Sequence, residues 1–252
     1  MFFLTPLDQF QIISLFSIKV FCFDFSFTNS SLICVVMIGA LIQLISYISS
    51  DDSSFFIIPS SWQVLIEVVY ETVSQLLFDN LGAKGEKYFP FVSVLFTFVL
   101  IANLIGLIPY SFTVTSHLIV TFLLALTVFI GVNIICFNEH KLNMISLFIP
   151  SNTSFLLALL LVPIEFVSYM FKPISLGVRL FANMMAGHTL LKVIAGFAWS
   201  MVSAGGLLFF AHIIPLFVLV LLVGLELGVA LIQAYVFTIL TCIYLNDSIN
   251  LH

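Results

Sequence analysis

The sequence predicts an all-α integral membrane protein. Of its 252 residues, 62% are apolar and only 8% are charged, whereas a soluble domain carries about 25% charged residues. The few charges fall mostly in short segments between apolar runs that are long enough to form membrane helices. The formal charge of -5 leaves no basic surface, so nucleic acid is not expected as a partner.

Four helices are expected in the first part of the chain. Residues 31–48 form an apolar run of about the length that crosses a bilayer. Over 60–80, apolar residues recur at steps of three and four, which predicts an amphipathic helix on the membrane surface. The apolar runs 89–109 and 116–137 predict two further transmembrane helices, joined by a short turn.

The last hundred residues predict a helical hairpin with unusually long arms, 151–200 and 207–246. Each arm is roughly 60 to 75 Å long if helical, about twice the thickness of a bilayer. Either each arm breaks into two spans, or each is one long helix inclined to the membrane normal. The whole chain, 1–252, is expected to form a single polytopic membrane domain.

Three short segments rich in polar or small residues are expected to connect these helices. They are 81–88 (LGAKGEKY), 138–141 (NEHK) and 199–206 (WSMVSAGG). The first two are interpreted as polar loops, and the two glycines of the third indicate the turn of the hairpin.

Ionisable side chains stand inside the hairpin, where each costs at least about 2.5 kcal/mol at the centre of a helix. On the first arm, Glu165, Lys172 and Arg179 follow one another at steps of seven, which is close to two helical turns. Asn183 lies four residues later on nearly the same face. His188 is nine residues past Arg179, about half a turn away. We therefore expect His188 to face away from this polar stripe.

The second arm carries its own polar stripe. His212, Glu226, Gln233 and Asp247 are spaced by multiples of seven, which predicts that they share one face. Such groups either pair with one another to hold the hairpin together or form a path for ions. Arg179 differs from the others, because its guanidinium presents five donors that no single partner satisfies. It must face a carboxylate, several carbonyls or water.

Other chemistries fit the sequence less well. A bis-haem or copper centre needs several intramembrane histidines, and only His188 and His212 lie within the predicted helices. There is no phosphate-binding loop, GxSxG elbow or HExxH motif. We therefore expect no cofactor, no metal and no catalytic site of its own. Proton or ion conduction suits acids, histidines and amides in hydrocarbon best.

Two alternatives to a proton channel remain at this point. A proton- or ion-coupled secondary transporter would show an inverted repeat with broken helices in matching halves, and no such repeat is visible. A purely structural membrane scaffold would tolerate neutral residues in place of Arg179 and Glu226.

Three segments resemble subunit a of the F-type ATP synthases, most closely its mitochondrial branch. They are Ser175–His188 (SLGVRLFANMMAGH), Pro109–His117 (PYSFTVTSH) and Gly224–His252. The resemblance implies a strongly inclined hairpin that packs against the ring of c subunits. It also implies contacts with membrane lipid, with other subunits of the membrane sector and with the peripheral stalk, and a location in the mitochondrial inner membrane.

The resemblance also implies roles for the polar residues. Arg179 would face the ring carboxylate and separate two aqueous half-channels. Glu226 and His188, with Asn183 and Gln233, would carry protons from the outer side to the ring. In many bacterial relatives the acid and the imidazole of this pair occupy the two positions the other way round.

On the exit side, the resemblance implies that Glu165 lines the path, with Asp247 as a further candidate. His212 lies on the predicted stripe, but the resemblance gives it no definite role. The segment 150–154 (PSNTS) is more polar than the family's usual lead-in to the first arm.

Overall fold

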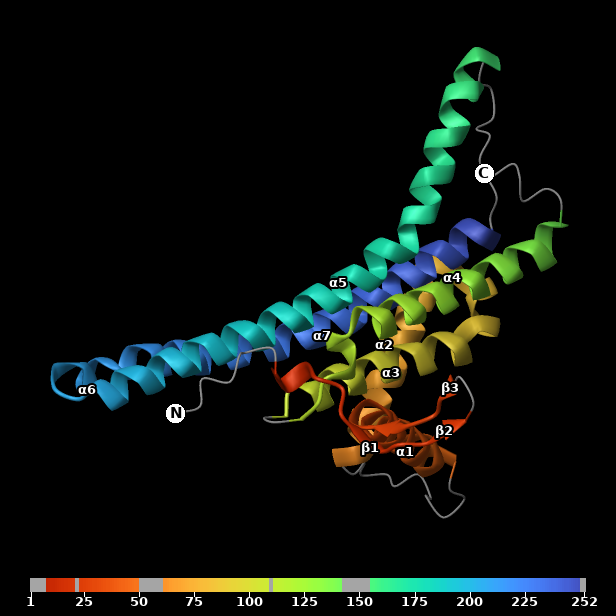
Figure 1. Cartoon of the computed structure of the whole chain (residues 1–252). Coiled ribbons are helices and arrows are strands. Elements are labelled where there is room, and N and C mark those ends of the chain that lie inside the picture. Colours follow the sequence, from red (N-terminus) through yellow and green to blue (C-terminus); the bar gives the residue numbers. More distant parts are fainter. Residues whose placement is uncertain (1–7, 21–22, 50–60, 109–110, 142–154, 250–252) are drawn as a thin grey trace. The chain divides into compact units, whose positions relative to one another are not determined.

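The computed structural model describes residues 8–20, 23–49, 61–108, 111–141 and 155–249 (Figure 1). The segment 150–154, including the predicted start of the first hairpin arm, lies outside these ranges. Helices make up most of the described chain: α1 Asn29–Ser49, α2 Ser61–Leu81, α3 Phe89–Gly106, α4 Leu118–His140, α5 Phe155–Ala204, α6 Leu207–Ala211 and α7 Ile213–Ile249.

Four of the described helical runs are long and apolar enough to cross a membrane: Ser61–Gly106, Leu118–His140, Leu160–Ala204 and Phe209–Ile249. The predicted all-α membrane fold is thus confirmed. Within α1, the described apolar stretch Asn29–Gln43 is shorter than a typical span.

The first hairpin arm, α5, is one continuous helix of 50 residues, or about 75 Å. The alternative of two separate spans is therefore wrong for this arm, and so long a helix fits a hydrocarbon layer of about 30 Å only if it is inclined or extends beyond it. Pro163 and Pro173 lie inside α5. Each proline removes one backbone hydrogen bond and crowds the preceding turn. The first half of α5 is visibly bent (Figure 1).

The second arm differs from the predicted 207–246 helix, because it breaks at His212 into the short α6 and the 37-residue α7. Pro215 explains the break. Its ring would clash with the carbonyl of Ala211 in a continuous helix, whereas proline is tolerated in a first turn. The first turn of α7 then starts with a bond from the Leu216 amide to the His212 carbonyl, 3.2 Å long.

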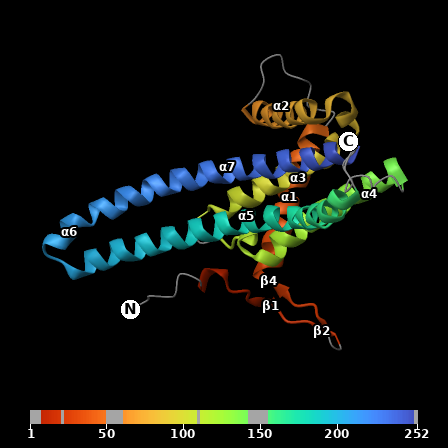
Figure 2. The same cartoon turned by 90° about the horizontal axis from the view of Figure 1, so that it is seen from above.

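The hairpin turn occupies only the end of the predicted segment 199–206, because α5 continues to Ala204 rather than ending at 200. Gly205 and Gly206 both have positive φ, at 68° and 62°, a conformation that favours glycine. From this turn, the nearby stretches of α5 and α7 run side by side in opposite directions (Figure 2).

The chain divides into two compact units, and α3, α5 and α7 each contribute to both. The first unit comprises Met1–Ser49, Phe98–His117 and Phe181–Ala234. The second comprises Ser50–Thr97, Leu118–Leu180 and Tyr235–His252.

The first unit begins with two short β-ladders that the all-α prediction missed. Strand β1 (Ser14–Phe16) pairs antiparallel with β4 (Phe27–Thr28), and β2 (Lys19–Val20) pairs with β3 (Phe23–Asp24). They follow a short 3₁₀ helix of one turn, η1, Asp8–Phe10.

Asn29 joins the β1–β4 ladder to α1. Its amide nitrogen donates to the Gln11 carbonyl at 3.0 Å, and its amide oxygen accepts from the Ile13 and Ser30 backbone amides. The same oxygen therefore helps to cap the first turn of α1.

In the second unit, two predicted loops are helical instead. The segment 81–88 forms the 3₁₀ helix η2, Gly82–Tyr88, which starts at Gly82 with φ 61°. Most of the segment 138–141 does not form a loop, because α4 continues to His140, and the next residue, Lys141, has φ 50°. Polar residues can continue a helix beyond its apolar part as readily as they form a loop. Composition alone therefore did not distinguish a helical segment from a loop at these two places.

The two spans after η2 also shift from their predicted bounds. Helix α3 ends at Gly106 rather than 109, and α4 begins at Leu118 rather than 116. Residue 116 instead closes the 3₁₀ helix η3, Val114–Ser116. The loop before α4 is therefore longer than predicted, and this loop lies next to the candidate site.

Candidate functional site

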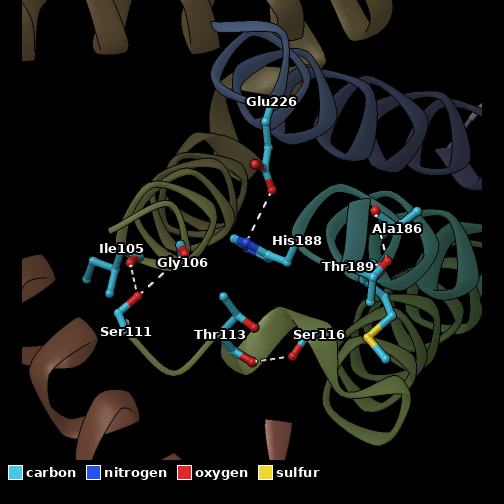
Figure 3. Close-up of polar contacts among 10 residues, drawn as sticks. Ile105, Gly106, Ser111, Thr113, Ser116, Ala186, His188, Thr189 and Glu226 are labelled. Atoms are coloured by element: carbon cyan, nitrogen blue, oxygen red, sulfur yellow. Dashed lines mark hydrogen bonds and ion pairs between the residues drawn. The ribbon is translucent and has the colours of Figure 1, made fainter. Parts of the chain in front are cut away.

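A histidine and a glutamate from the two hairpin arms meet in the first unit. Nδ1 of His188 on α5 lies 3.3 Å from Oε1 of Glu226 on α7 (Figure 3). The His188 side chain is 12% exposed and the Glu226 side chain 7% exposed. An imidazole and a carboxyl group at this distance can exchange a proton directly, since each has a lone pair or a hydrogen to offer.

Gly187 leaves the space that the Glu226 side chain occupies. A Cβ atom at position 187 would lie 2.7 Å from Oε1 of Glu226 and 3.1 Å from its carboxyl carbon. Real Cβ atoms do not approach other atoms so closely, so any larger residue would displace the carboxyl group. The residue next to His188 thus places Glu226 against α5.

The His188 ring is enclosed by parts of the chain far away in sequence. The Phe10 ring lies with its centroid 6.4 Å from the centroid of the imidazole. At Gly106, near the end of α3, a Cβ would lie 3.0 Å from Cγ2 of Thr113 and 3.9 Å from Nε2 of His188. Gly106 therefore lies beside both Thr113 and His188 (Figure 3).

The loop that carries Thr113 is tied down by its own serines. Oγ of Ser111 donates to the Ile105 carbonyl at 2.8 Å, and Oγ of Ser116 donates to the Thr113 carbonyl at 2.6 Å. At the end of the loop, His117 stacks on Phe112 with ring centroids 5.0 Å apart. Burial lowers the pKa of the His117 imidazole.

A second contact between the arms lies next to the first. Nδ2 of Asn183 donates to Oε1 of Gln233 at 2.9 Å, so α5 and α7 meet at both pairs. Nearby on α7, the Ala230 carbonyl accepts from Nδ2 of the buried Asn103 at 3.3 Å. His188 was predicted to face away from the polar stripe of the first arm, and this is wrong for one member of that stripe, Asn183, because both side chains reach α7. A count of 100° per residue ignores how far a long side chain can swing.

In the second unit, Lys172 and Asp247 form an ion pair. Nζ of Lys172 lies 3.2 Å from Oδ2 of Asp247, and the ammonium also stands 5.3 Å from the ring centroid of Tyr169 and 4.8 Å from that of Tyr244. The hydroxyl of Tyr169 donates to Oδ1 of Asn133 on α4. Asp247 is thus held beside a lysine and two aromatic rings.

The remaining predicted site residues of α5 are exposed. Arg179 lies between the buried Leu176 and Leu180 but is itself exposed, and among the described residues no carboxylate forms an ion pair with it. Glu165 is exposed as well and makes no ion pair within the described part of the chain. Both residues belong to the second unit, whereas His188 and Glu226 belong to the first.

His212 does not belong to the polar stripe of α7. It lies in the break before that helix, and its Nδ1 contacts the Phe209 carbonyl. The spacing that placed His212 with Glu226 assumed an unbroken helix, and Pro215 makes that assumption wrong.

Several residues of these clusters were not predicted from the sequence: Asn103, Gly106, Thr113, Asn133, Tyr169, Gly187 and Tyr244. Asn103 and Asn133 stand out only as amides within apolar runs. For the others no sequence signal exists, because periodicity within one helix carries no information about partners on another element. The described residues contain no group of three or more His, Cys, Asp or Glu side chains that could hold a metal ion.

Comparison with known proteins assigns a family to most of the chain. The profile of the family described as ATP synthase A chain matches residues 31–246. ATP synthase subunit a of Pylaiella littoralis is 57% identical over 98% of this chain and 99% of its own length. The proteins of the same name from Chondrus crispus and Marchantia polymorpha are 50% and 48% identical over 98% of this chain, and over 97% and 99% of their own lengths.

Proposed function

Because the chain belongs to the ATP synthase A chain family, a membrane subunit of the Fo sector, we propose that it carries protons to and from a ring of c subunits. Two aqueous half-channels would reach the ring carboxylates from opposite sides of the membrane. Proton flow through them would couple to rotation of the ring and so to ATP synthesis. The chain would provide no catalytic site of its own.

The observation that carries this proposal is the His188–Glu226 pair, 3.3 Å apart and nearly buried in apolar helices. Ionisable groups in such a setting are expensive, so a function is the first explanation to consider. A titratable acid and base in contact supply a step for protons in hydrocarbon. Asn183 and Gln233, joined at 2.9 Å, are uncharged donors and acceptors next to this step on the same two arms.

Arg179 is proposed as the charge that separates the two half-channels. Its guanidinium stays protonated at any physiological pH, so it cannot itself relay a proton. It is exposed on α5 and has no carboxylate partner among the described residues. A carboxylate of another subunit would be the partner of Arg179, and the positive charge of the guanidinium would favour the ionised form of that carboxylate.

The second unit is proposed to line the opposite half-channel. Glu165 is exposed on α5, and Asp247 is only partly covered, with 43% of its side chain accessible next to Lys172. Acidic groups in this position would accept protons released from the ring.

The proposed surroundings follow from the exposed surface and from the relatives. Large apolar side chains are exposed along both arms, among them Phe197 on α5 and Phe217 and Leu221 on α7. In a membrane protein such side chains meet lipid or other transmembrane helices. We propose the c-ring, other Fo and peripheral-stalk subunits and lipid as these partners, and the mitochondrial inner membrane as the location.

The proposal is tested by ATP-driven acidification of inverted membrane vesicles that contain the assembled complex. Arg179→Ala is compared with the unmodified chain and with Lys87→Ala, which removes an exposed cation of η2, outside the hairpin segments of the sequence. We expect Arg179→Ala to abolish acidification at an unchanged amount of assembled subunit, and Lys87→Ala to leave it unchanged.

Normal acidification in the Arg179→Ala complex would overturn the proposed coupling charge. Equal loss in both variants would show that removal of any cation is harmful, and would also contradict the specific role of Arg179. Glu226→Gln adds a second readout: it should slow proton uptake at normal assembly, whereas loss of assembly alone would favour a structural pair.

A further inference from the structure

Several buried polar atoms of the first unit have no hydrogen-bonding partner among the residues that the structure describes. They are Oγ1 of Thr113, Oγ1 of Thr115, Oδ1 of Asn103 and Nε2 of His188. Thr113 is 3% exposed, Thr115 is 4% exposed and Asn103 is fully buried. All four residues belong to the first unit.

Thr113 occupies an N-cap position, where a threonine normally uses its hydroxyl in a hydrogen bond to the helix backbone. It is the N-cap residue of η3, with φ -90° and ψ 110°, yet its side chain makes no capping bond. Threonine at an N-cap ordinarily accepts a hydrogen bond from the first turn of the helix. Here the loop is closed through the Thr113 carbonyl, which accepts from Oγ of Ser116. The hydroxyl is therefore left for another partner.

Gly106 brings Thr113 and His188 to the same small space. One point, the place of a Cβ on Gly106, lies 3.0 Å from Cγ2 of Thr113 and 3.9 Å from Nε2 of His188. Because glycine has no Cβ, both side chains can approach there (Figure 3). Nδ1 of the same imidazole lies beside Glu226, and Nε2 is the ring nitrogen that lies close to this point.

A buried hydroxyl and a buried ring nitrogen without partners are each costly in an interior. Proteins usually resolve such a pair with an ordered water molecule that bonds to two or more polar atoms. A hydroxyl suits this task beside a titrating imidazole, because it both donates and accepts and can turn when the ring gains or loses a proton.

We propose that Thr113 is a positioning residue that, together with Nε2 of His188, holds a water molecule in the proton path. This inference rests on the proposed function and adds to it the route by which His188 meets water. The protonated ring would donate Nδ1–H to Glu226 and Nε2–H to this water. His188 thus exchanges one proton with each neighbour, and the Thr113 hydroxyl gains and loses none.

The direct test is a high-resolution density map of the unmodified, assembled complex. We expect a water peak within hydrogen-bonding distance of both Oγ1 of Thr113 and Nε2 of His188. Apolar packing that fills this position, or a direct bond between the two side chains, would overturn the inference. This measurement needs no variant, so it does not depend on whether a substituted chain folds.

A functional test compares two substitutions at position 113 in the assembled complex. Thr113→Val keeps the shape but removes the hydroxyl, and we expect it to slow ATP-driven acidification about tenfold. Thr113→Ser keeps the hydroxyl and should restore most of the rate. Thr241→Val is the matched control, because Thr241 is also fully buried but bonds to the Phe237 carbonyl of its own helix.

The outcomes separate this inference from the proposed function. If Glu226→Gln slows acidification while Thr113→Val does not, the proton path stands and the role of Thr113 is overturned. If neither substitution slows acidification, the proposed function is overturned, and the inference that rests on it is overturned as well. If Thr113→Ser is as slow as Thr113→Val, the methyl group and not the hydroxyl matters, which also overturns the inference.

Discussion

Nδ1 of His188 lies 3.3 Å from Oε1 of Glu226, and the two residues come from opposite arms of one hairpin. The backbone permits this approach only because Gly187 has no side chain where the carboxyl group lies. The packing of the two arms thus holds an acid and a base in contact.

Gly187→Ala should damage proton uptake without preventing helix formation. Its Cβ would lie 2.7 Å from Oε1 of Glu226, and the end of this flexible side chain would have to move away from His188. We expect acidification to fall at least about tenfold. Gly196→Ala is the control on the same helix, since a Cβ there has no atom within 4 Å. Equal rates in the two variants would contradict the packing argument.

Asn183 and Gln233 should show coupled effects. Removing either partner leaves the other amide without its 2.9 Å bond, at a cost of about 0.5–1.5 kcal/mol. In a double-mutant cycle with Asn183→Leu and Gln233→Leu, we expect the double variant to lose less activity than the sum of the single losses. The measurement is the rate of acidification per assembled complex. Strict additivity would show that the observed bond has no part in function.

Lys172 and Asp247 should contribute modestly to stability. Their side chains are 28% and 43% exposed, so solvent screening limits the ion pair to about 0–1 kcal/mol. The contacts with Tyr169 and Tyr244 add about 0.5–1 kcal/mol. Heating of the assembled complex should show slightly earlier dissociation for Lys172→Met, and little further change when Asp247→Asn is added. A large drop from the second substitution would mean that Asp247 has another partner.

The helices were predictable because the sequence signal for them is strong and local. Long apolar runs specify membrane helices whatever their surroundings, and Gly205 and Gly206 mark the hairpin turn within one residue. Polar composition was a weaker signal, since η2 and the end of α4 are helical where loops were predicted. The β-ladders between Ser14 and Thr28 show that short alternating segments can pair even in a chain dominated by helices.

The site was only partly predictable, for a different reason. His188, Glu226, Asn183 and Gln233 stand out because polar groups in hydrocarbon need an explanation. Their actual pairing depends on how two helices are staggered, which periodicity within one helix does not contain. Thr113 and Gly106 come from a loop and from another helix, and their importance appears only in three dimensions. The break at His212 could have been predicted only by interpreting Pro215 as a residue in the first turn of a new helix.

The central claim is that His188 and Glu226 act as one proton site, and an exchange of the two side chains tests it most directly. Acidification is measured for His188→Glu, for Glu226→His and for the chain with both substitutions, at equal amounts of assembled subunit. We predict that each single substitution lowers the rate at least about tenfold and that the double substitution recovers a large part of it, because an acid and an imidazole again face each other. Normal rates in the single variants, or a double variant no faster than the slower single one, would contradict the account.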